Sequence, residues 1–115
     1  MKKVTITLDH VQRLNLVVLI DVAKLQNNEL RAYWEIQDSL KLSDEEGEQI
    51  GLHFQPMQGG GQAPLWDPKK KLSTEAREFE FSKDQITKLK KVVQQADLNA
   101  AQRTWLEPLM DQLEA

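Results

Sequence analysis

The sequence predicts a single α+β domain of two strand-helix-helix units joined by a β-hairpin, with about four helices over a small sheet. A chain of 115 residues has the usual size for one hydrophobic core, which favours one domain spanning residues 1–115. Two similar segments predict the paired units, and a glycine-containing segment between them predicts the hairpin. The expected boundaries are residues 3–42 for the first unit, 43–72 for the hairpin insert and 73–115 for the second unit.

The two similar segments span residues 5–18 and 78–93. In each, alternating apolar and polar residues are followed by apolar residues three and four apart, which predicts a strand and then a helix. Thr7 and Ser82 stand where the period changes and are expected to cap the helices. At a displacement of 75 (86 minus 11) apolar residues coincide: Val4 with Phe79, Ile6 with Phe81, Val11 with Ile86, Leu14 with Leu89, Val17 with Val92, and Val18 with Val93. The match is consistent with internal duplication and equally with two unrelated amphipathic units that happen to align.

A second amphipathic segment follows each long helix and carries a tryptophan, Trp34 in the first unit and Trp105 in the second. Matching these tryptophans needs a displacement of 71 (105 minus 34), which implies that the link between the helices differs in length. Pro108 lacks an amide donor, so we expect the last helix to kink or restart near Glu107.

The insert between the units has its own pattern. Ser43 and Glu46 have the spacing of a capping box, which predicts a short helix ending near Gly51. Residues 52–56 and 63–66 then flank a glycine run, as expected for a hairpin, and their prolines restrict the strands to edge positions.

The units differ in the polarity of their long helices. Leu16, Leu19 and Ile20 of the first unit align with polar residues of the second at the displacement of 75, and with Ala23 they form an apolar stripe. This stripe adds to an expected core face made of Val11, Leu14, Val18, Val22 and Leu25. The first helix is therefore expected to be apolar on two sides.

Two covers for the second side remain open. The hairpin, with Leu52, Phe54, Met57, Leu65 and Trp66, could fold over it, or another polypeptide could bind there, either a second copy or a foreign protein. The leading hypothesis is a non-enzymatic protein-binding module. Its predicted docking surface consists of Leu16, Leu19, Ile20, Ala23 and Trp66.

The alternative hypothesis is contact with nucleic acid through a local ridge of lysines. The candidate residues are Lys69, Lys70, Lys71, Lys88 and Lys91. The net charge of −3 and the absence of arginine or interleaved aromatic residues in these clusters make nucleic acid the weaker prediction.

No pattern predicts a catalytic centre, a metal site or a cofactor. His10 and His53 lack the spacing of metal ligands, and the chain contains no cysteine. The glycines at 59–61 are not followed by the lysine and hydroxyl residue of a phosphate-binding loop. The longest apolar run, residues 16–20, is far shorter than the roughly 20 residues of a membrane span. We therefore expect a non-enzymatic cytoplasmic protein without membrane contact.

Four segments together resemble small proteins encoded by tailed phages and prophages. They are RAYWEIQDSLKLSDEE from Arg31, LWDP from Leu65, FEFS from Phe79 and WLEPLMDQL from Trp105. The resemblance implies expression in a bacterial cytoplasm and a role as an assembly factor or as an inhibitor of a host or immune complex. It brings no functional residues with it.

Overall fold

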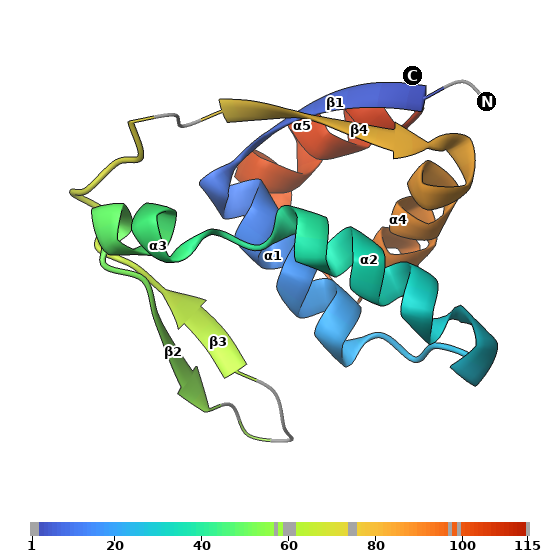
Figure 1. The fold of residues 1–115 in the computed structure, drawn as a ribbon, viewed down its shortest axis with the longest axis horizontal. Helices are drawn as coiled ribbons and strands as arrows, with labels where there is room; N and C mark the ends of the chain where they lie inside the picture. Colours follow the sequence, from blue (N-terminus) through green and yellow to red (C-terminus); the bar gives the residue numbers. More distant parts are fainter. Residues whose placement is uncertain are drawn as a thin grey trace.

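The computed structural model describes residues 3–56, 58, 62–73, 76–96, 98 and 100–114, and these form a small α+β fold (Figure 1). Five α-helices occur in the described residues, where about four were expected, together with two short 3₁₀ helices and two two-stranded sheets. The elements in chain order are β1 (Lys3–Asp9), α1 (His10–Val22), η1 (Asn27–Glu29), α2 (Leu30–Leu40), α3 (Asp44–Ile50), β2 (His53–Pro56), β3 (Gln62–Leu65), β4 (Ala76–Ser82), α4 (Lys83–Gln95), η2 (Ala100–Gln102) and α5 (Arg103–Glu114).

The first and last strands pair with each other. β1 and β4 are antiparallel, with Ile6 opposite Phe79, and they run along one side of the helices (Figure 1). Residues on one face of this sheet are buried and those on the other are exposed, which confirms the predicted alternation. The buried face is formed by Ile6, Leu8, Phe79 and Phe81.

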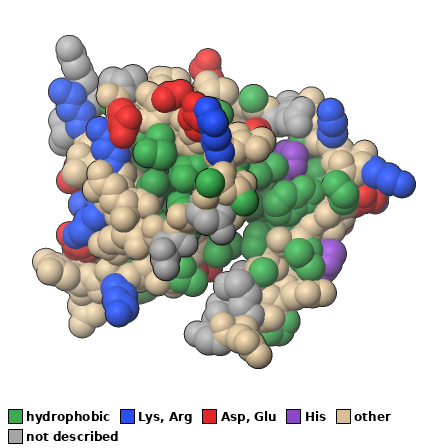
Figure 2. Space-filling view, turned by 180° about the vertical axis from the view of Figure 1, so that it is seen from behind, with side chains coloured by type: hydrophobic (Ala, Val, Ile, Leu, Met, Phe, Trp, Pro, Cys, Tyr) green, Lys and Arg blue, Asp and Glu red, His purple; other side chains and the backbone are tan. Residues whose placement is uncertain are grey.

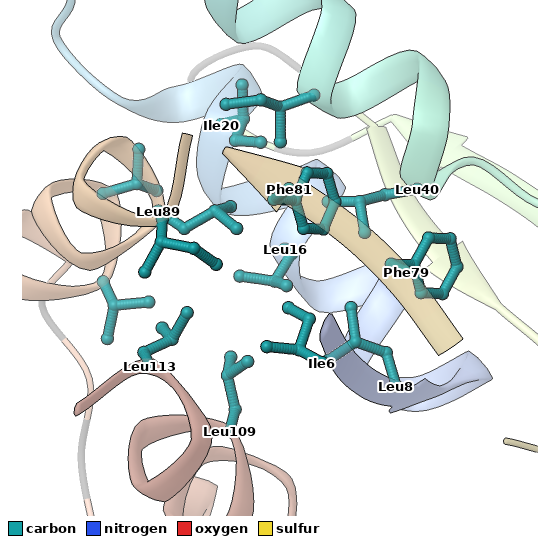
Figure 3. Close-up of a cluster of buried hydrophobic side chains, with 14 of the residues drawn as sticks. Ile6, Leu8, Leu16, Ile20, Leu40, Phe79, Phe81, Leu89, Leu109 and Leu113 are labelled. Carbon is teal, nitrogen blue, oxygen red and sulfur yellow. The ribbon is translucent and has the colours of Figure 1, made fainter. Parts of the chain in front are cut away.

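Side chains from four helices complete the main core beneath this sheet. Figure 3 shows Leu16 and Ile20 of α1 pointing into the cluster that also contains Leu40 of α2, Leu89 of α4 and Leu109 of α5. Both halves of the chain therefore share one main core. Leu16 is fully buried, so the expectation that Leu16 and Ile20 lie on a second, partner-facing side of their helix is wrong.

The reason is an error of two residues in the predicted alignment. In the structure, each element of the second unit begins 73 residues after its counterpart in the first unit. The difference is 76 minus 3 for the strands, 83 minus 10 for the long helices and 103 minus 30 for the last helices. At this displacement Leu16 corresponds to Leu89 and Ile20 to Val93, and all four are core residues. A common origin of the two units remains a prediction.

The helix caps follow the same displacement. Asp9 caps α1 through a capping box with Gln12, and Ser82 caps α4 through a capping box with Gln85. The prediction for Ser82 is confirmed, and the prediction that Thr7 caps the first helix is wrong because the strand continues to Asp9. The extra apolar stripe of α1 is therefore Leu14, Val18 and Val22, whose counterparts on α4 are Thr87, Lys91 and Gln95.

The last helices also depart from the prediction in detail. Trp105 is buried and Trp34 is exposed, so the two tryptophans are not structural equivalents. α5 continues through Pro108, so the expected restart near Glu107 is wrong.

The hairpin of β2 and β3 projects from the body at the end next to α3 (Figure 1). At its base, Leu52 and Trp66 pack against a second cluster that contains Leu14, Ile50 and Leu72. The insert therefore covers the inner part of the extra stripe. Met57 and the predicted glycine tip at 59–61 lie outside the described residues.

Candidate functional site

A groove of about 1030 Å³ lies between α1, the link from α2 to α3, α3 and the start of β2. Its apolar lining combines Val17 and Val18 of α1 with Leu52 and Phe54 of the insert. Phe54 is 51% exposed. Figure 2 shows hydrophobic side chains gathered near the junction of the hairpin with the helical body. The insert thus leaves part of the extra stripe of α1 uncovered.

Charged side chains form the rim of this groove. Asp21, Asp44 and Glu48 are exposed there, and Lys41 is the basic lining residue. The ammonium group of Lys41 lies 3.7 Å from the Asp38 carboxylate, and both side chains are largely exposed, so Lys41 is one cation beside three exposed carboxylates. The rim is therefore predominantly acidic.

Arg13 fixes the wall of the groove that α3 provides. Its guanidinium donates hydrogen bonds to the carbonyl oxygens of Leu40 at 3.0 Å and Lys41 at 2.9 Å, and to the Glu46 carboxylate at 2.8 Å. The side chain is almost completely buried, and it also lies over the ring of Phe79 at 5.2 Å. One residue of α1 thus joins the end of α2, the first turn of α3 and the sheet.

Other contacts complete this wall. Ser43 and Glu46 form the predicted capping box at the start of α3, which is confirmed. Gly51 ends the helix at φ 68°, a conformation that favours glycine. The amide of Asp67 then donates to the carbonyl oxygen of Ile50 at 2.9 Å, which holds the returning end of the hairpin against α3.

Gln37 holds Asp21, the acidic rim residue on α1. Its side-chain amide donates to the Val17 carbonyl oxygen at 3.0 Å and to the Asp21 carboxylate at 2.5 Å. Because Gln37 is buried on α2, Asp21 is held beside the groove.

The contact with Arg13 makes the stability of the fold depend on pH. The hydrogen bond from Arg13 lowers the pKa of the Glu46 carboxyl from 4.5 to about 2. A carboxyl whose pKa is depressed in the folded state stabilises the fold above its unfolded pKa, and this contribution is lost as pH falls through the folded pKa. We expect Glu46 to contribute about 3 kcal/mol at neutral pH and to lose this contribution between pH 4.5 and about 2.

Urea unfolding from pH 7 to pH 2 measures this contribution, with Glu46→Gln as the comparison. The difference in unfolding free energy between the two proteins should shrink as pH falls through this range. If the difference stays constant with pH, the contact with Arg13 does not lower the pKa of Glu46.

Each of the two histidines has a contact within the described part of the chain. His10 is buried against Trp66, with ring centroids 5.8 Å apart, and His53 contacts the Gly51 carbonyl oxygen at 3.1 Å. Across the described residues, no group of three histidine or carboxylate side chains is placed to hold a metal ion.

The five residues predicted for docking do not share one surface. Leu16 and Ile20 are core residues, and Trp66 is half-buried in the second cluster. Leu19 and Ala23 pack at the edge of the core and line a separate depression of about 470 Å³ between α1 and α4. The groove instead uses Val18, which the sequence analysis placed on the core face of α1, and Asp21, which it did not assign to either face.

The five lysines of the alternative hypothesis are also separated. Lys88 pairs with Asp84 at 3.0 Å and Lys91 with Glu29 at 3.5 Å, both involving α4. Lys69, Lys70 and Lys71 are exposed on the segment after the hairpin, at the opposite end of the molecule from α4 (Figure 1). They form no continuous basic ridge with the lysines of α4.

The fold and the groove define a small α+β protein with an apolar groove and an acidic rim. No family model, curated protein sequence or solved structure matches this chain. Within the part of the chain that the structure describes, no helix is both long and apolar enough to cross a membrane.

Proposed function

We propose that this chain is a non-enzymatic protein-binding module that holds a segment of a partner protein in the groove between α1, α3 and β2. The supporting observation is the uncovered part of the extra apolar stripe, where Val18 stands in the place that Lys91 occupies on α4. The equivalent site on α4 is polar, so an apolar residue is not required by the helix itself. Burying an aliphatic or aromatic side chain fully is worth about 1.5 to 3 kcal/mol, which favours an occupant over Val18 and Phe54.

The rim favours a basic amphipathic segment as that occupant. Asp21, Asp44 and Glu48 would attract lysine or arginine side chains on either side of an apolar row. A helix that places apolar residues into a groove and basic residues along its edges has this chemistry. A second copy is less suitable, because the chain itself has a net charge of −3.

The resemblance to phage proteins supports a cellular context for this binding. The module would then be an assembly factor or an inhibitor of a bacterial host or immune complex, acting in the cytoplasm by occupying a basic segment of its target. Binding to nucleic acid through the exposed lysines stays the alternative, and the separation of the lysines makes it weaker.

Val18→Lys is expected to weaken docking and leave the fold intact. The lysine would place a charge on the groove floor, whereas α4 already carries a lysine at the equivalent position. The probe is an amphipathic peptide of about 18 residues, with leucines on one face and lysines on the other. We expect calorimetry to show binding to the wild type and binding at least about tenfold weaker to the variant.

Val22→Gln is the matched control. Val22 lies on the same helix and is 57% exposed, but it lines the depression beside α4 and not the groove. This variant should bind the lysine peptide like the wild type, and a peptide with glutamate in place of lysine should bind neither protein. Equal losses in both variants, or equal binding of both peptides, would contradict docking in the groove.

A further inference from the structure

The outer edges of β1 and β4 differ in the hydrogen bonds that their main-chain groups form. Residues on paired antiparallel strands alternate between pointing their N–H and C=O groups toward the neighbouring strand and away from it. On β1, the amide of Thr7 donates to the Gln112 side-chain oxygen at 2.6 Å, and the Gln112 amide donates back to the Thr7 carbonyl oxygen at 2.8 Å. The main chain of Thr7 therefore points away from β4.

The pairing register shows which main-chain groups of β4 also point away from the sheet. Thr7 lies opposite Glu78 and Thr5 opposite Glu80, so the N–H and C=O groups of both glutamates point away from β1. The amide of Ser82 supports this direction, since it donates to the Gln85 side chain at 2.9 Å rather than to β1. No described residue hydrogen-bonds to these outward groups of Glu78 and Glu80.

The two edges of the sheet therefore differ in whether a side chain hydrogen-bonds to their outward main-chain groups. Gln112 of α5 covers the edge of β1 like a short piece of a third strand. Its counterpart at the displacement of 73 is Ser39 of α2 (112 minus 73), whose hydroxyl donates to the Glu35 carbonyl oxygen within its own helix. Among the described residues, none covers the edge of β4 as Gln112 covers the edge of β1.

We infer that β4 accepts an extended segment of a partner protein as a third strand, and that this segment carries lysine or arginine at alternate positions. Glu78 and Glu80 are exposed on the outer face, and their neighbours on β1 are the uncharged Thr7 and Thr5. Basic side chains on an added strand would lie beside both carboxylates. Pairing of β4 with β4 of a second copy would bring glutamates together, which disfavours self-association through this edge.

Amide hydrogen exchange tests the added strand directly. The probe is a capped peptide of about eight residues that alternates lysine and valine. On peptide binding, exchange at the amides of Glu78 and Glu80 is expected to slow by at least about tenfold, while exchange at the Thr5 amide stays unchanged. The same peptide with N-methyl groups on its edge-facing amides should give no protection.

Variants separate the main-chain contribution from the charge. Glu78→Pro removes an outward N–H together with the carboxylate and is expected to weaken binding about tenfold more than Glu78→Gln, which removes only the charge, while Thr5→Pro removes an outward N–H on the β1 edge and should have no effect on binding. If Glu78→Pro does not fold, the N-methylated peptide gives the same test on the unchanged protein. Glu78→Gln together with Glu80→Gln should weaken binding and reduce its dependence on salt, with the amide protection retained in the bound state.

Three results would overturn the inference: no binding of the alternating peptide up to about 1 mM, binding without protection at Glu78 and Glu80, or protection caused by self-association of the free protein. Each result leaves docking in the groove untouched, because the groove residues are on α1, α3 and β2 and are tested with a different peptide.

Discussion

Arg13→Met is expected to lower the free energy of unfolding by about 3 to 5 kcal/mol, because it removes one partner of a buried ion pair. The Glu46 carboxylate and the carbonyl oxygens of Leu40 and Lys41 would lose the hydrogen bonds that Arg13 donates. Methionine fills a similar apolar volume, so the effect would report the lost polar contacts more than a cavity. Urea unfolding at pH 7 measures the change.

Arg103→Met provides the surface comparison. Arg103 pairs with Glu107 one turn away on α5, and both side chains are largely exposed. Such pairs contribute little, so we expect a change of less than about 0.5 kcal/mol. Similar effects of the two substitutions would contradict the anchoring role of Arg13.

Leu16→Ala is expected to destabilise the protein by about 2 to 5 kcal/mol, because Leu16 is fully buried among side chains of the main core. Val22→Ala, on the same helix, removes a side chain that is mostly in water and should change stability by less than about 0.5 kcal/mol. Thermal and urea unfolding of both variants compare the two positions. A small effect at Leu16 would mean that the predicted second stripe, and not the stripe of Leu14, Val18 and Val22, faces away from the core.

Much of the fold follows from patterns that are local in the sequence. The alternation in β1 and β4, the capping boxes at Ser43 and Ser82, and the hairpin of β2 and β3 all depend on neighbouring residues. Local rules such as strand period and cap geometry determine these features, and the structure confirms them.

The same local rules could not predict which face of α1 packs in the core. α1 has apolar residues around most of its circumference, so a displacement of 75 aligned apolar residues as well as the true displacement of 73. The capping glutamines Gln12 and Gln85 carried the signal that would have chosen correctly, since they are 73 residues apart and each forms a capping box. Apolar matching alone does not separate two candidate phases on such a helix.

The role of Arg13 also lay outside local reasoning. A single arginine among apolar residues predicts a solvent-exposed side chain. The partners of Arg13 are on α2 and α3, far along the chain. The acidic rim was likewise assembled from separate elements, with Asp21 on α1 and Asp44 and Glu48 on α3. Only the packing of the insert against α1 brings them to one groove.

Methyl NMR during titration with the lysine amphipathic peptide tests the groove most directly. The proposed docking predicts that the methyl signals of Val18 and Leu52 shift together with the aromatic signals of Phe54, while those of Val22 and Ala23 do not move. Shifts centred on Val22 and Ala23, or no shifts at saturating peptide, would contradict it.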